Sequence, residues 1–402
     1  MSIKFKDAVQ IISGGTPDTK TPSYWNGDIP WLSVVDFGSV NKYVSSTEKH
    51  ISEAGLNNSA TKMLKTDDII ISARGTVGAM AMLEKSMAFN QSCFGLRAKP
   101  EVVDQEFLFY YLRFYMKNIT QKSQGSVFAT INLDTFDMID LNLPPLNVQK
   151  KIAKVLSDID AKIDNNNAIA AELEGMAKDL YDYWFVQFDF PDENGKPYKS
   201  SGGKMVWNEE MKREIPEGWE VYQLDELFRF VKGRIPTEVF DTNDGNNLIP
   251  YLTIEAVNAV PTSYCKKQGM ITTAGDTIMV MDGAASSETY VGHYGALGST
   301  FAKLEKVNGR ATDSFVYVIM QKYQSVFKKV NTGSTVPHAN KDYISKFKVV
   351  LPQDDCLKNM AIKFDTWVQK QIQVWEENAE LTSLRDFLLP MLMNGQVKVK
   401  GA

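Results

Sequence analysis

The chain repeats one order of motifs at a constant distance of 208 residues. Around Gly125 it reads Gly-Ser-Val-Phe-Ala-Thr-Ile-Asn, and around Gly333 it reads Gly-Ser-Thr-Val-Pro-His-Ala-Asn. A Leu-Pro pair follows each segment, at Leu143-Pro144 and at Leu351-Pro352. Solenoids and propellers repeat about every 20 to 50 residues. A period this long therefore indicates two copies of one large unit, and two reading units suit a ligand that has two parts.

Composition places the chain among folded proteins, with 402 residues, 44% of them hydrophobic and 11% aromatic. This length allows two to four domains of about 100 to 200 residues each. No apolar run approaches the roughly 20 residues of a membrane-spanning helix, and the first six residues lack the apolar run of a signal peptide. Three scattered cysteines, Cys93, Cys265 and Cys356, form no Cys-x-x-Cys pair. We therefore expect a cytoplasmic protein without structural zinc.

The formal net charge is −5 at pH 7. Domains that bind nucleic acid are usually basic, so this balance argues weakly against a nucleic-acid ligand. A local positive cleft, or a basic partner, can still supply the charge that phosphates require. Charge alone does not decide the class of ligand.

Hydrophobic patterning divides the chain into five parts. Residues 1–144 and 219–352 contain short β-branched and aromatic runs bounded by Gly, Pro, Asn and Asp, which predicts two mixed α/β domains. Residues 145–188 and 353–402 instead carry apolar residues at steps of three and four, which predicts a long amphipathic helix in each. Residues 189–218 are polar and turn-rich, as expected of a connector rather than a core.

The two predicted helices are expected to pack against each other. A helix from about 146 to 184 would be roughly 55–60 Å long, which is too long to bury its apolar stripe on its own domain. We therefore predict an α+β protein in which two α/β domains alternate with two antiparallel helices, paired as a pseudo-twofold coiled coil. Asn165, Asn166 and Asn167 interrupt the first stripe. These asparagines either set the register of the pair or break the helix.

Motifs for catalysis are absent or incomplete. The sequence has no phosphate-binding Gly-x-x-x-x-Gly-Lys loop, no His-Glu-x-x-His helix and no Gly-x-Ser-x-Gly elbow. Pro191-Asp192 with Glu210-Met211-Lys212 imitates a nuclease metal motif, but both halves lie in the polar connector. Asn142-Leu143-Pro144-Pro145 resembles a methyltransferase Asn-Pro-Pro motif that an extra leucine splits. We expect no catalytic residue and no metal site.

Two turns in each copy offer side chains that could read a ligand. Arginine and asparagine match base edges in the DNA major groove, whereas serine, threonine and lysine suit phosphates. The alternative, given equal weight, is that such residues only shape the turns. The candidates are Arg74, Thr76, Ser126, Thr130 and Asn132 in the first copy and Ser286, Ser287, Ser334, His338, Asn340 and Lys341 in the second. The copies differ at matched positions, with Arg74 against Asp282 and Thr130 against His338.

Four segments carry a resemblance to a known family. They are Leu-Pro-Pro-Leu-Asn-Val-Gln-Lys-Lys-Ile-Ala at 143–153, Tyr-Trp-Phe-Val-Gln-Phe at 183–188, Pro-Glu-Gly-Trp at 216–219 and Leu-Arg-Asp-Phe-Leu-Leu-Pro at 384–390. With the repeat, they make the whole chain resemble the specificity subunit of a Type I restriction-modification system. One departure is Gln353-Asp354-Asp355-Cys356, where the first copy has Pro145-Leu146-Asn147-Val148. The second long helix therefore starts less regularly, and we expect its contact surface for a partner subunit to differ from that of the first.

The resemblance implies a non-catalytic subunit whose two target-recognition domains each read one half of a bipartite, asymmetric site in double-stranded DNA. It implies that the paired helices fix the gap and dock two methyltransferase (modification) subunits, which methylate adenine at N6 with S-adenosylmethionine. Restriction (translocase) subunits would add ATP- and Mg-dependent cleavage, and this chain would hold no cofactor. The residues expected on the docking helices are Ile152, Ile159, Leu173, Leu180, Trp184, Phe364, Leu381 and Leu388.

Two alternatives from other classes remain at the level of sequence. A self-contained DNA modification enzyme would need a cofactor loop and an intact Asn-Pro-Pro motif, which the sequence lacks. A scaffold protein whose helices bridge two globular domains would need neither. A neighbouring methyltransferase gene would favour DNA recognition over the scaffold.

Overall fold

The computed structural model describes residues 2–38, 42–122, 130–243, 247–258, 261–307, 309–333 and 335–399. The chain divides into two compact units. Unit 1 consists of Met1–Asp164 and Glu380–Ala402, and unit 2 consists of Asn165–Ala379. Both boundaries fall inside long helices, so each unit combines one globular domain with portions of two helices.

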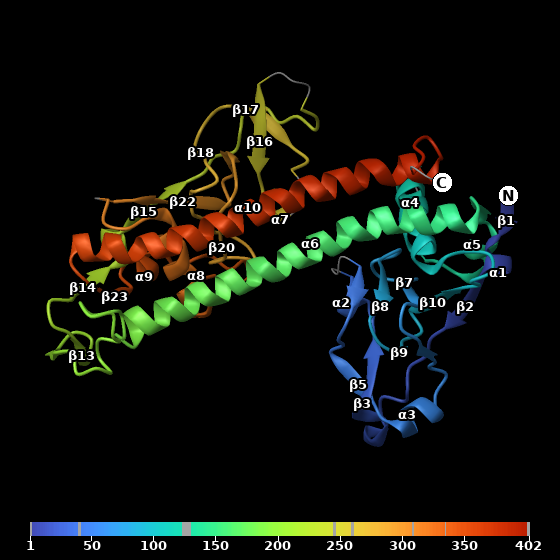
Figure 1. The fold of residues 1–402 in the computed structure, drawn as a ribbon, viewed down its shortest axis with the longest axis horizontal. Helices are drawn as coiled ribbons and strands as arrows, with labels where there is room; N and C mark the ends of the chain where they lie inside the picture. The colour runs from blue at the N-terminus through green and yellow to red at the C-terminus, as the bar shows by residue number, and fades with distance from the viewer. Residues whose placement is uncertain are drawn as a thin grey trace. The chain divides into compact units, whose positions relative to one another are not determined.

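Unit 1 is built on two sheets and one long helix, α4 (Gln105–Lys122) (Figure 1). The five-stranded sheet has the order β2 (Val9–Ser13), β10 (Cys93–Ala98), β7 (Ile69–Ser72), β8 (Met80–Leu83) and β4 (Tyr43–Val44). The four-stranded sheet has the order β5 (Lys49–Ile51), β3 (Trp25–Leu32), β9 (Met87–Phe89) and β6 (Met63–Leu64). A two-stranded ladder joins β1 (Ser2–Lys4) to β11 (Asp140–Asn142). Short helices complete the unit: α1 (Phe5–Ala8), η1 (Pro22–Tyr24), α2 (Val34–Phe37), α3 (Glu53–Asn57) and α5 (Leu133–Asp137).

The run of three isoleucines in β7 shows why this strand lies in the centre of the unit. Successive side chains of a strand point to opposite faces of its sheet. Ile69 and Ile71 therefore join the apolar cluster that contains α4, whereas Ile70 joins the cluster that contains β6 and β9. All three side chains are buried. An unbroken apolar run is what a strand covered on both faces requires.

Unit 2 repeats this plan. One four-stranded sheet has the order β15 (Phe228–Lys232), β22 (Phe301–Lys306), β19 (Ile278–Val280) and β20 (Thr289–Tyr290). The other has the order β17 (Tyr264–Lys266), β16 (Leu248–Leu252), β21 (Gly295–Leu297) and β18 (Ile271–Thr272). A ladder joins β14 (Glu220–Gln223) to β23 (Lys348–Leu351). The helices are η3 (Leu224–Glu226), α7 (Ile254–Asn258), α8 (Asp313–Lys329) and α9 (Lys341–Ser345).

The repeat predicted from the sequence is confirmed element by element. The second-copy elements β22, α8, α9 and the long helix α10 (Asp354–Met393) each begin 208 residues after β10, α4, α5 and the long helix α6 (Leu146–Tyr181). Both copies also pair two strands in parallel, β3 with β9 and β16 with β21. The mixed α/β class predicted for both globular domains is therefore correct.

Each unit contains an antiparallel crossing of α6 and α10. In unit 1, Asp160 of α6 contacts Arg385 of α10. In unit 2, Asn166 donates hydrogen bonds from Nδ2 to Glu377 Oε2 at 2.7 Å and to Asn378 Oδ1 at 2.9 Å. Helix α6 continues through Asn165–Asn167. The helix break considered above is therefore wrong, and the asparagines instead bond across the helix pair, as a register-setting patch would.

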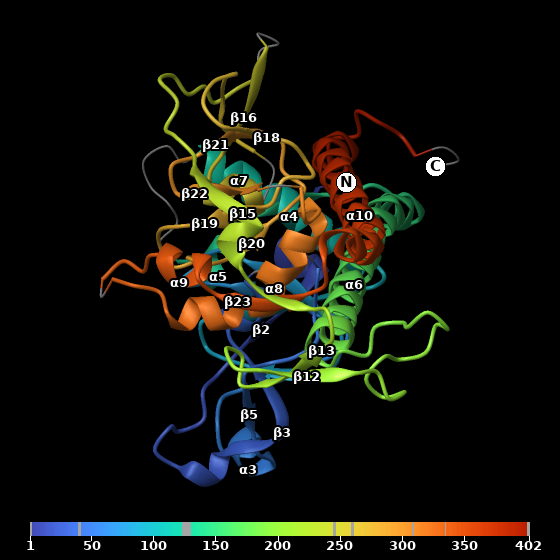
Figure 2. The same cartoon turned by 90° about the vertical axis from the view of Figure 1, so that its left-hand side faces the viewer.

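The connector contains more structure than its composition predicts. Strands β12 (Met205–Asn208) and β13 (Arg213–Pro216) pair as a hairpin, which Figures 1 and 2 place beside the end of α6. There α6 passes into a π-helical turn, η2 (Asp182–Val186). Phe190 and Ile215 are buried, and the Phe190 ring stacks on Trp219 with centroids 4.6 Å apart. The expectation that 189–218 adds nothing to a core is wrong, because aromatic side chains anchor the connector.

No helix in the part of the chain that the structure describes is long and apolar enough to cross a membrane.

Candidate nucleic-acid interface

The structure brings together the two turns that the sequence singles out in each copy. In unit 1, the Ile131 amide before α5 donates to the Ala73 carbonyl after β7, at 2.9 Å. In unit 2, the Ala339 amide before α9 donates to the Met281 carbonyl after β19, at 2.8 Å. We call each pair of turns a paired-turn site. It lies at the same place in both domains, so the fold presents two equivalent platforms that carry different side chains.

The unit 1 site exposes polar and cationic groups. Arg74, Thr76 and Thr130 are all exposed. Gly75 and Gly78 have φ values of +78° and +84°, a conformation that favours glycine and explains why both flank this turn. The Arg74 guanidinium makes no hydrogen bond or ion pair with another described residue. An exposed guanidinium suits a ligand with paired acceptors, such as a guanine edge or a phosphate.

The unit 2 site carries a different set of charges. His338 Nδ1 lies 2.8 Å from Asp282 Oδ1, and Lys232 Nζ lies 3.5 Å from Asp282 Oδ2. Partial burial raises the pKa of Asp282, but the hydrogen bond from His338 and the nearby Lys232 charge outweigh it and hold this pKa below its usual value. Lys341 Nζ lies 5.9 Å from the centre of the Phe230 ring. The unit 2 site thus presents the Asp282 carboxylate beside His338 and Lys232, where the unit 1 site presents the single Arg74 guanidinium.

Two of the predicted contact residues face inward. Ser286 and Ser287 are fully buried. Ser286 Oγ lies within hydrogen-bond distance of the carbonyl oxygens of Gly283 and Pro337, and Ser287 Oγ donates to Asn331 Oδ1 at 2.6 Å. The expectation that these hydroxyls reach a ligand is wrong, because the turn uses them to join β19 to the loop before α9. Ser126 and Ser334 lie outside the described residues.

The two matched asparagines have a local structural role. Asn132 Oδ1 accepts from the Thr135 amide at 2.9 Å and caps α5. Asn340 Oδ1 accepts from the Tyr343 amide at 3.1 Å and caps α9. A cap accepts a backbone amide that lacks a partner inside the helix. The repeated asparagine therefore follows from helix initiation, which is the turn-shaping alternative considered above.

Serine substitutions separate capping from base reading. Serine also caps a helix, so Asn132→Ser and Asn340→Ser are expected to change the free energy of unfolding by less than about 0.5 kcal/mol. Alanine at either position is expected to cost about 1 kcal/mol. Urea unfolding of the four variants measures this. A serine variant that keeps its stability but alters sequence preference in DNA binding would assign the amide a reading role instead.

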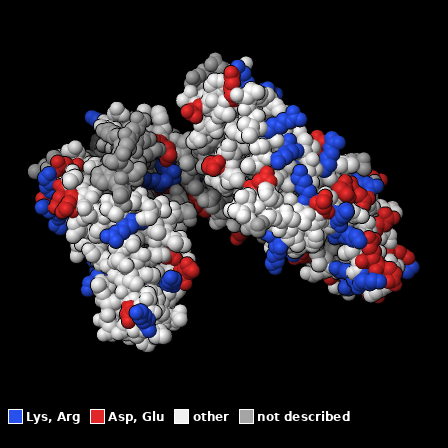
Figure 3. Space-filling view, turned by 180° about the vertical axis from the view of Figure 1, so that it is seen from behind, with Lys and Arg blue, Asp and Glu red and all other residues white. Residues whose placement is uncertain are grey.

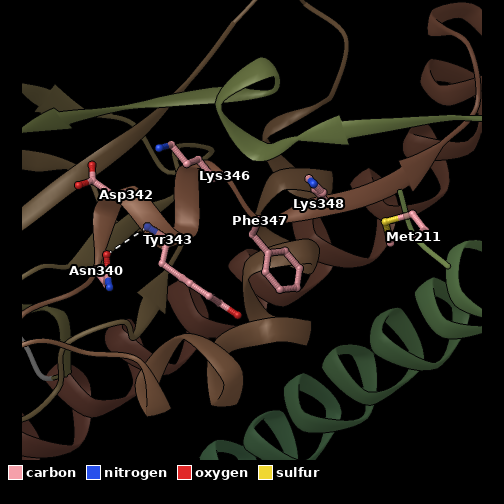
Figure 4. A pocket seen from close by; sticks show the side chains of 7 residues that line it. All are labelled: Met211, Asn340, Asp342, Tyr343, Lys346, Phe347 and Lys348. Atoms are coloured by element: carbon pink, nitrogen blue, oxygen red, sulfur yellow. Dashed lines mark hydrogen bonds between the residues drawn. The ribbon is translucent and has the colours of Figure 1, made fainter. Parts of the chain in front are cut away.

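An open pocket of about 670 Å³ adjoins the α9 cap in unit 2 (Figure 4). Tyr343 and Phe347 form its aromatic side, with ring centroids 6.1 Å apart. Lys348 Nζ on its rim is paired with Glu210 at 2.8 Å. Met211, from the β12–β13 hairpin, also lines it. Unit 1 has no counterpart of that hairpin among its described elements, so the pocket is not a repeated feature.

The residues expected on the docking helices fall into two groups. Ile152, Trp184 and Phe364 are buried in the cores of their own units, so they cannot present a surface to a partner, and this corrects the prediction. The others are partly exposed: Ile159, Leu173, Leu180, Leu381 and Leu388. Two further helix residues, Met176 and Leu384, stand 208 residues apart and are 50% and 46% exposed.

Charge is unevenly distributed over the visible surface. On the face that Figure 3 shows, Lys and Arg side chains form a row across unit 2, and Asp and Glu gather toward one end of that unit. Among the described residues, no group of three or more His, Cys, Asp or Glu side chains could hold a metal ion. The net acidic chain thus still carries local basic surface.

Comparison with known proteins gives one consistent result. The chain matches the family described as Type I restriction modification DNA specificity domain over residues 1–175 and 216–387. It is 25% identical to the MjaIX specificity subunit of Methanocaldococcus jannaschii, over 99% of this chain and 93% of that one. It is 22% identical to the HindI specificity subunit of Haemophilus influenzae, over 92% and 95%. A crystal structure of an S subunit from M. genitalium shares the fold with a TM-score of 0.56, at 18% identity over 98% and 95% of the two chains.

Proposed function

The chain belongs to the Type I restriction-modification DNA specificity family, and on that premise we propose that each of its units reads one half of a bipartite DNA target. The chain is thus the specificity subunit of such a system, with double-stranded DNA and the other subunits as its partners. The observation that carries the proposal is the pair of equivalent paired-turn sites with different side chains. Two structurally equivalent sites with different side chains suit a DNA target whose two halves differ in sequence.

The side chains at the two sites support different base preferences. Arginine bonds both acceptors of a guanine edge in the major groove, so Arg74 favours guanine in the half-site of unit 1. Asp282 is an acceptor and suits the amino group of cytosine or adenine, while His338 beside it donates or accepts. We propose that these residues give the two halves their different identities.

We further propose that helices α6 and α10 set the gap between the two half-sites. Both chain connections between the units run inside these helices, which have 36 and 40 residues. Helix length changes by about 1.5 Å per residue, so the number of residues in α6 and α10 is the natural determinant of the gap. Insertion of whole turns near Asn165–Asn167 in α6, matched in α10, should lengthen the gap and leave both half-sites unchanged.

Two equivalent apolar stripes support docking of two modification subunits. The unit 2 stripe is Leu173, Met176 and Leu180, and the unit 1 stripe is Leu381, Leu384 and Leu388. In each, an exposed central residue lies between two half-buried leucines on one helix face. Two surfaces of the same chemistry, 208 residues apart, suit two copies of one partner.

Aspartate at the centre of each stripe is expected to remove one partner copy at a time. Leu384→Asp and Met176→Asp each place a charge in an apolar contact, which should weaken one docking event at least tenfold. Native mass spectrometry of the chain with its modification subunit should show a single bound copy for each variant and none for the double variant. Ser383→Asp, which adds the same charge to the neighbouring exposed position, is the control and should bind two copies.

We assign the chemistry to the partner subunits: adenine-N6 methylation with S-adenosylmethionine, and cleavage driven by ATP and Mg. This division of labour is the one that the family resemblance implies. Calorimetry of this chain alone with S-adenosylmethionine should give no binding heat. Saturable binding would instead favour a self-contained modification enzyme, and loss of all DNA preference would favour a scaffold.

The half-site proposal is tested by mapping methylated bases. The chain, assembled with its modification subunit, should methylate one bipartite sequence in unmodified genomic DNA. Arg74→Ala should relax preference about ten- to a hundredfold in one half, and His338→Ala should do so only in the other. Lys85→Ala, at an exposed lysine of unit 1, is the control and should leave both halves intact. Relaxation of both halves by either variant would contradict the assignment of one half to each unit.

A further inference from the structure

A buried ion pair joins the two long helices within unit 1. Arg385 Nη1 of α10 lies 2.7 Å from Asp160 Oδ1 of α6, and the two side chains are 6% and 0% exposed. The hydroxyl of Tyr110, on α4, donates to the other carboxylate oxygen at 2.6 Å. Figure 1 shows α4 where the two helices meet. One globular domain and two helices thus share a single carboxylate.

The cationic side of this cluster is equally constrained. Arg385 also bonds Asp386 Oδ1, from Nε at 3.2 Å and from Nη2 at 3.1 Å. Arg113 lies close enough that burial, and then the charge of Arg385, lower its pKa, while Asp160 opposes that change. Asp160 therefore neutralises positive charge at a place that water does not reach. Removal of Arg385 would take the ion pair from the buried Asp160 carboxylate, and removal of Asp160 would leave Arg385 paired with Asp386.

The three equivalent residues in unit 2 are apolar. The positions 208 residues from Tyr110, Asp160 and Arg385 are occupied by Val318, Val368 and Ala177. All three are at most 4% exposed, and together they line a small cavity. The leucines beside this place match, since Leu173 and Leu180 correspond to Leu381 and Leu388. Farther along, the apolar contacts differ: unit 2 has Tyr181, Trp184 and Phe364 where unit 1 has Leu389, Leu392 and Leu156. At positions 160 and 385 themselves, the difference is one of charge.

This difference restricts which helix ends can complete which domain. The end of α10 completes unit 1, and the end of α6 completes unit 2. Were two first halves of the chain to pair with each other, Asp160 would face Ala177. Were two second halves to pair, Arg385 would face Val368. Each wrong pairing separates Asp160 from Arg385 and places one of these buried charges opposite an apolar side chain, whereas the native pairing brings the two charges together.

We propose that the Asp160–Arg385 pair selects association between the two different halves of the chain over association of either half with itself. Apolar contacts accommodate different apolar partners, whereas a buried charge requires its counter-ion. The ion pair thus acts on partner choice between copies of this chain, as a single buried polar group does in coiled coils. The inference is independent of the DNA target.

A nicked full-length protein tests this selectivity. A protease site between Ser201 and Gly202, in an exposed turn, allows the folded chain to be cut into two halves that stay together. Wild-type protein is nicked, dissociated in urea and reassembled. Native mass spectrometry then counts mixed pairs, which contain one first half and one second half, and like pairs, which contain two first halves or two second halves. Mixed pairs should exceed like pairs more than a hundredfold. Asp160→Val with Arg385→Ala, which reproduces the unit 2 residues, should raise like pairs at least tenfold.

The aromatic contacts of Trp219 with Phe188 and Phe190 also join the two halves, but they are the same in wild type and variant. The comparison therefore reports on positions 160 and 385. Equal fractions of like pairs in the two proteins, or random pairing in the wild type, would overturn the proposal.

A charge exchange covers the case in which the apolar variant does not fold. Nicked protein carrying Asp160→Arg with Arg385→Asp is mixed with nicked wild type, and the four kinds of half-chain are reassembled together. Only parental combinations should form, since a crossed pair would oppose two arginines or two aspartates. Crossed pairs at the random frequency would show that this contact does not choose the partner.

Discussion

Replacement of Arg385 by methionine is expected to destabilise unit 1 by about 3 to 5 kcal/mol. The cost arises because Asp160 stays buried at 0% exposure without its counter-ion. Methionine keeps most of the apolar stem of arginine, so packing changes little. Urea unfolding, with hydrogen exchange of the α4 amides to isolate unit 1, measures the loss.

Two further variants show whether charge is the cause. Asp160→Val combined with Arg385→Met removes both charges, and most of the lost stability should return. Lys154→Met breaks an exposed ion pair with Asp158 on the same helix and should cost less than about 1 kcal/mol. A double variant as unstable as Arg385→Met alone would mean that packing, not an unpaired carboxylate, explains the loss.

Exchange of residues 1–144 for the first recognition domain of another family member is expected to change one half-site completely. The old half should lose at least a hundredfold in methylation rate, because several base pairs are mismatched at once and each costs about 1 to 3 kcal/mol. The gap and the other half should stay as they were, since residues 145–402 are untouched. Sequencing of methylated adenines in the product DNA reads all three features together.

The choice of donor domain provides the matched control. The donor should carry tyrosine at the position of Tyr110, because that hydroxyl satisfies Asp160 in the retained helix. A second chimera with phenylalanine there should recognise the same new half-site but unfold at lower urea. Altered spacing between the half-sites in either chimera would contradict the assignment of the gap to the helices.

Local sequence signals predicted the helical framework well. The Leu-Pro junctions and the three-four spacing place the starts of both long helices within a few residues of Leu146 and Asp354. These features depend on neighbours in sequence, as helix initiation and amphipathicity do. The capping role of Asn132 and Asn340 was equally local, and each asparagine stands three residues before the amide that it accepts.

The candidate sites were harder to predict because their surroundings come from distant parts of the chain. Ser286 and Ser287 look like surface hydroxyls, but Ser287 has a φ of +72° and their acceptors, Pro337 and Asn331, come from a later loop. Asp160 and Arg385 stand 225 residues apart in the sequence. A charged residue near an apolar stripe is normally expected to face solvent. Only the fold reveals that the two charges meet.

The position of the unit boundaries has a consequence for synthesis of the protein. Unit 1 needs Glu380–Ala402, so the first domain to leave the ribosome lacks Leu389, Leu392 and Arg385 until nearly the whole chain has been made. At about 5 to 20 residues per second, that interval lasts on the order of 10 to 50 seconds. During it Asp160 has no counter-ion and the apolar face of α6 is uncovered. The folding of unit 1 is therefore completed only after the second recognition domain has been translated.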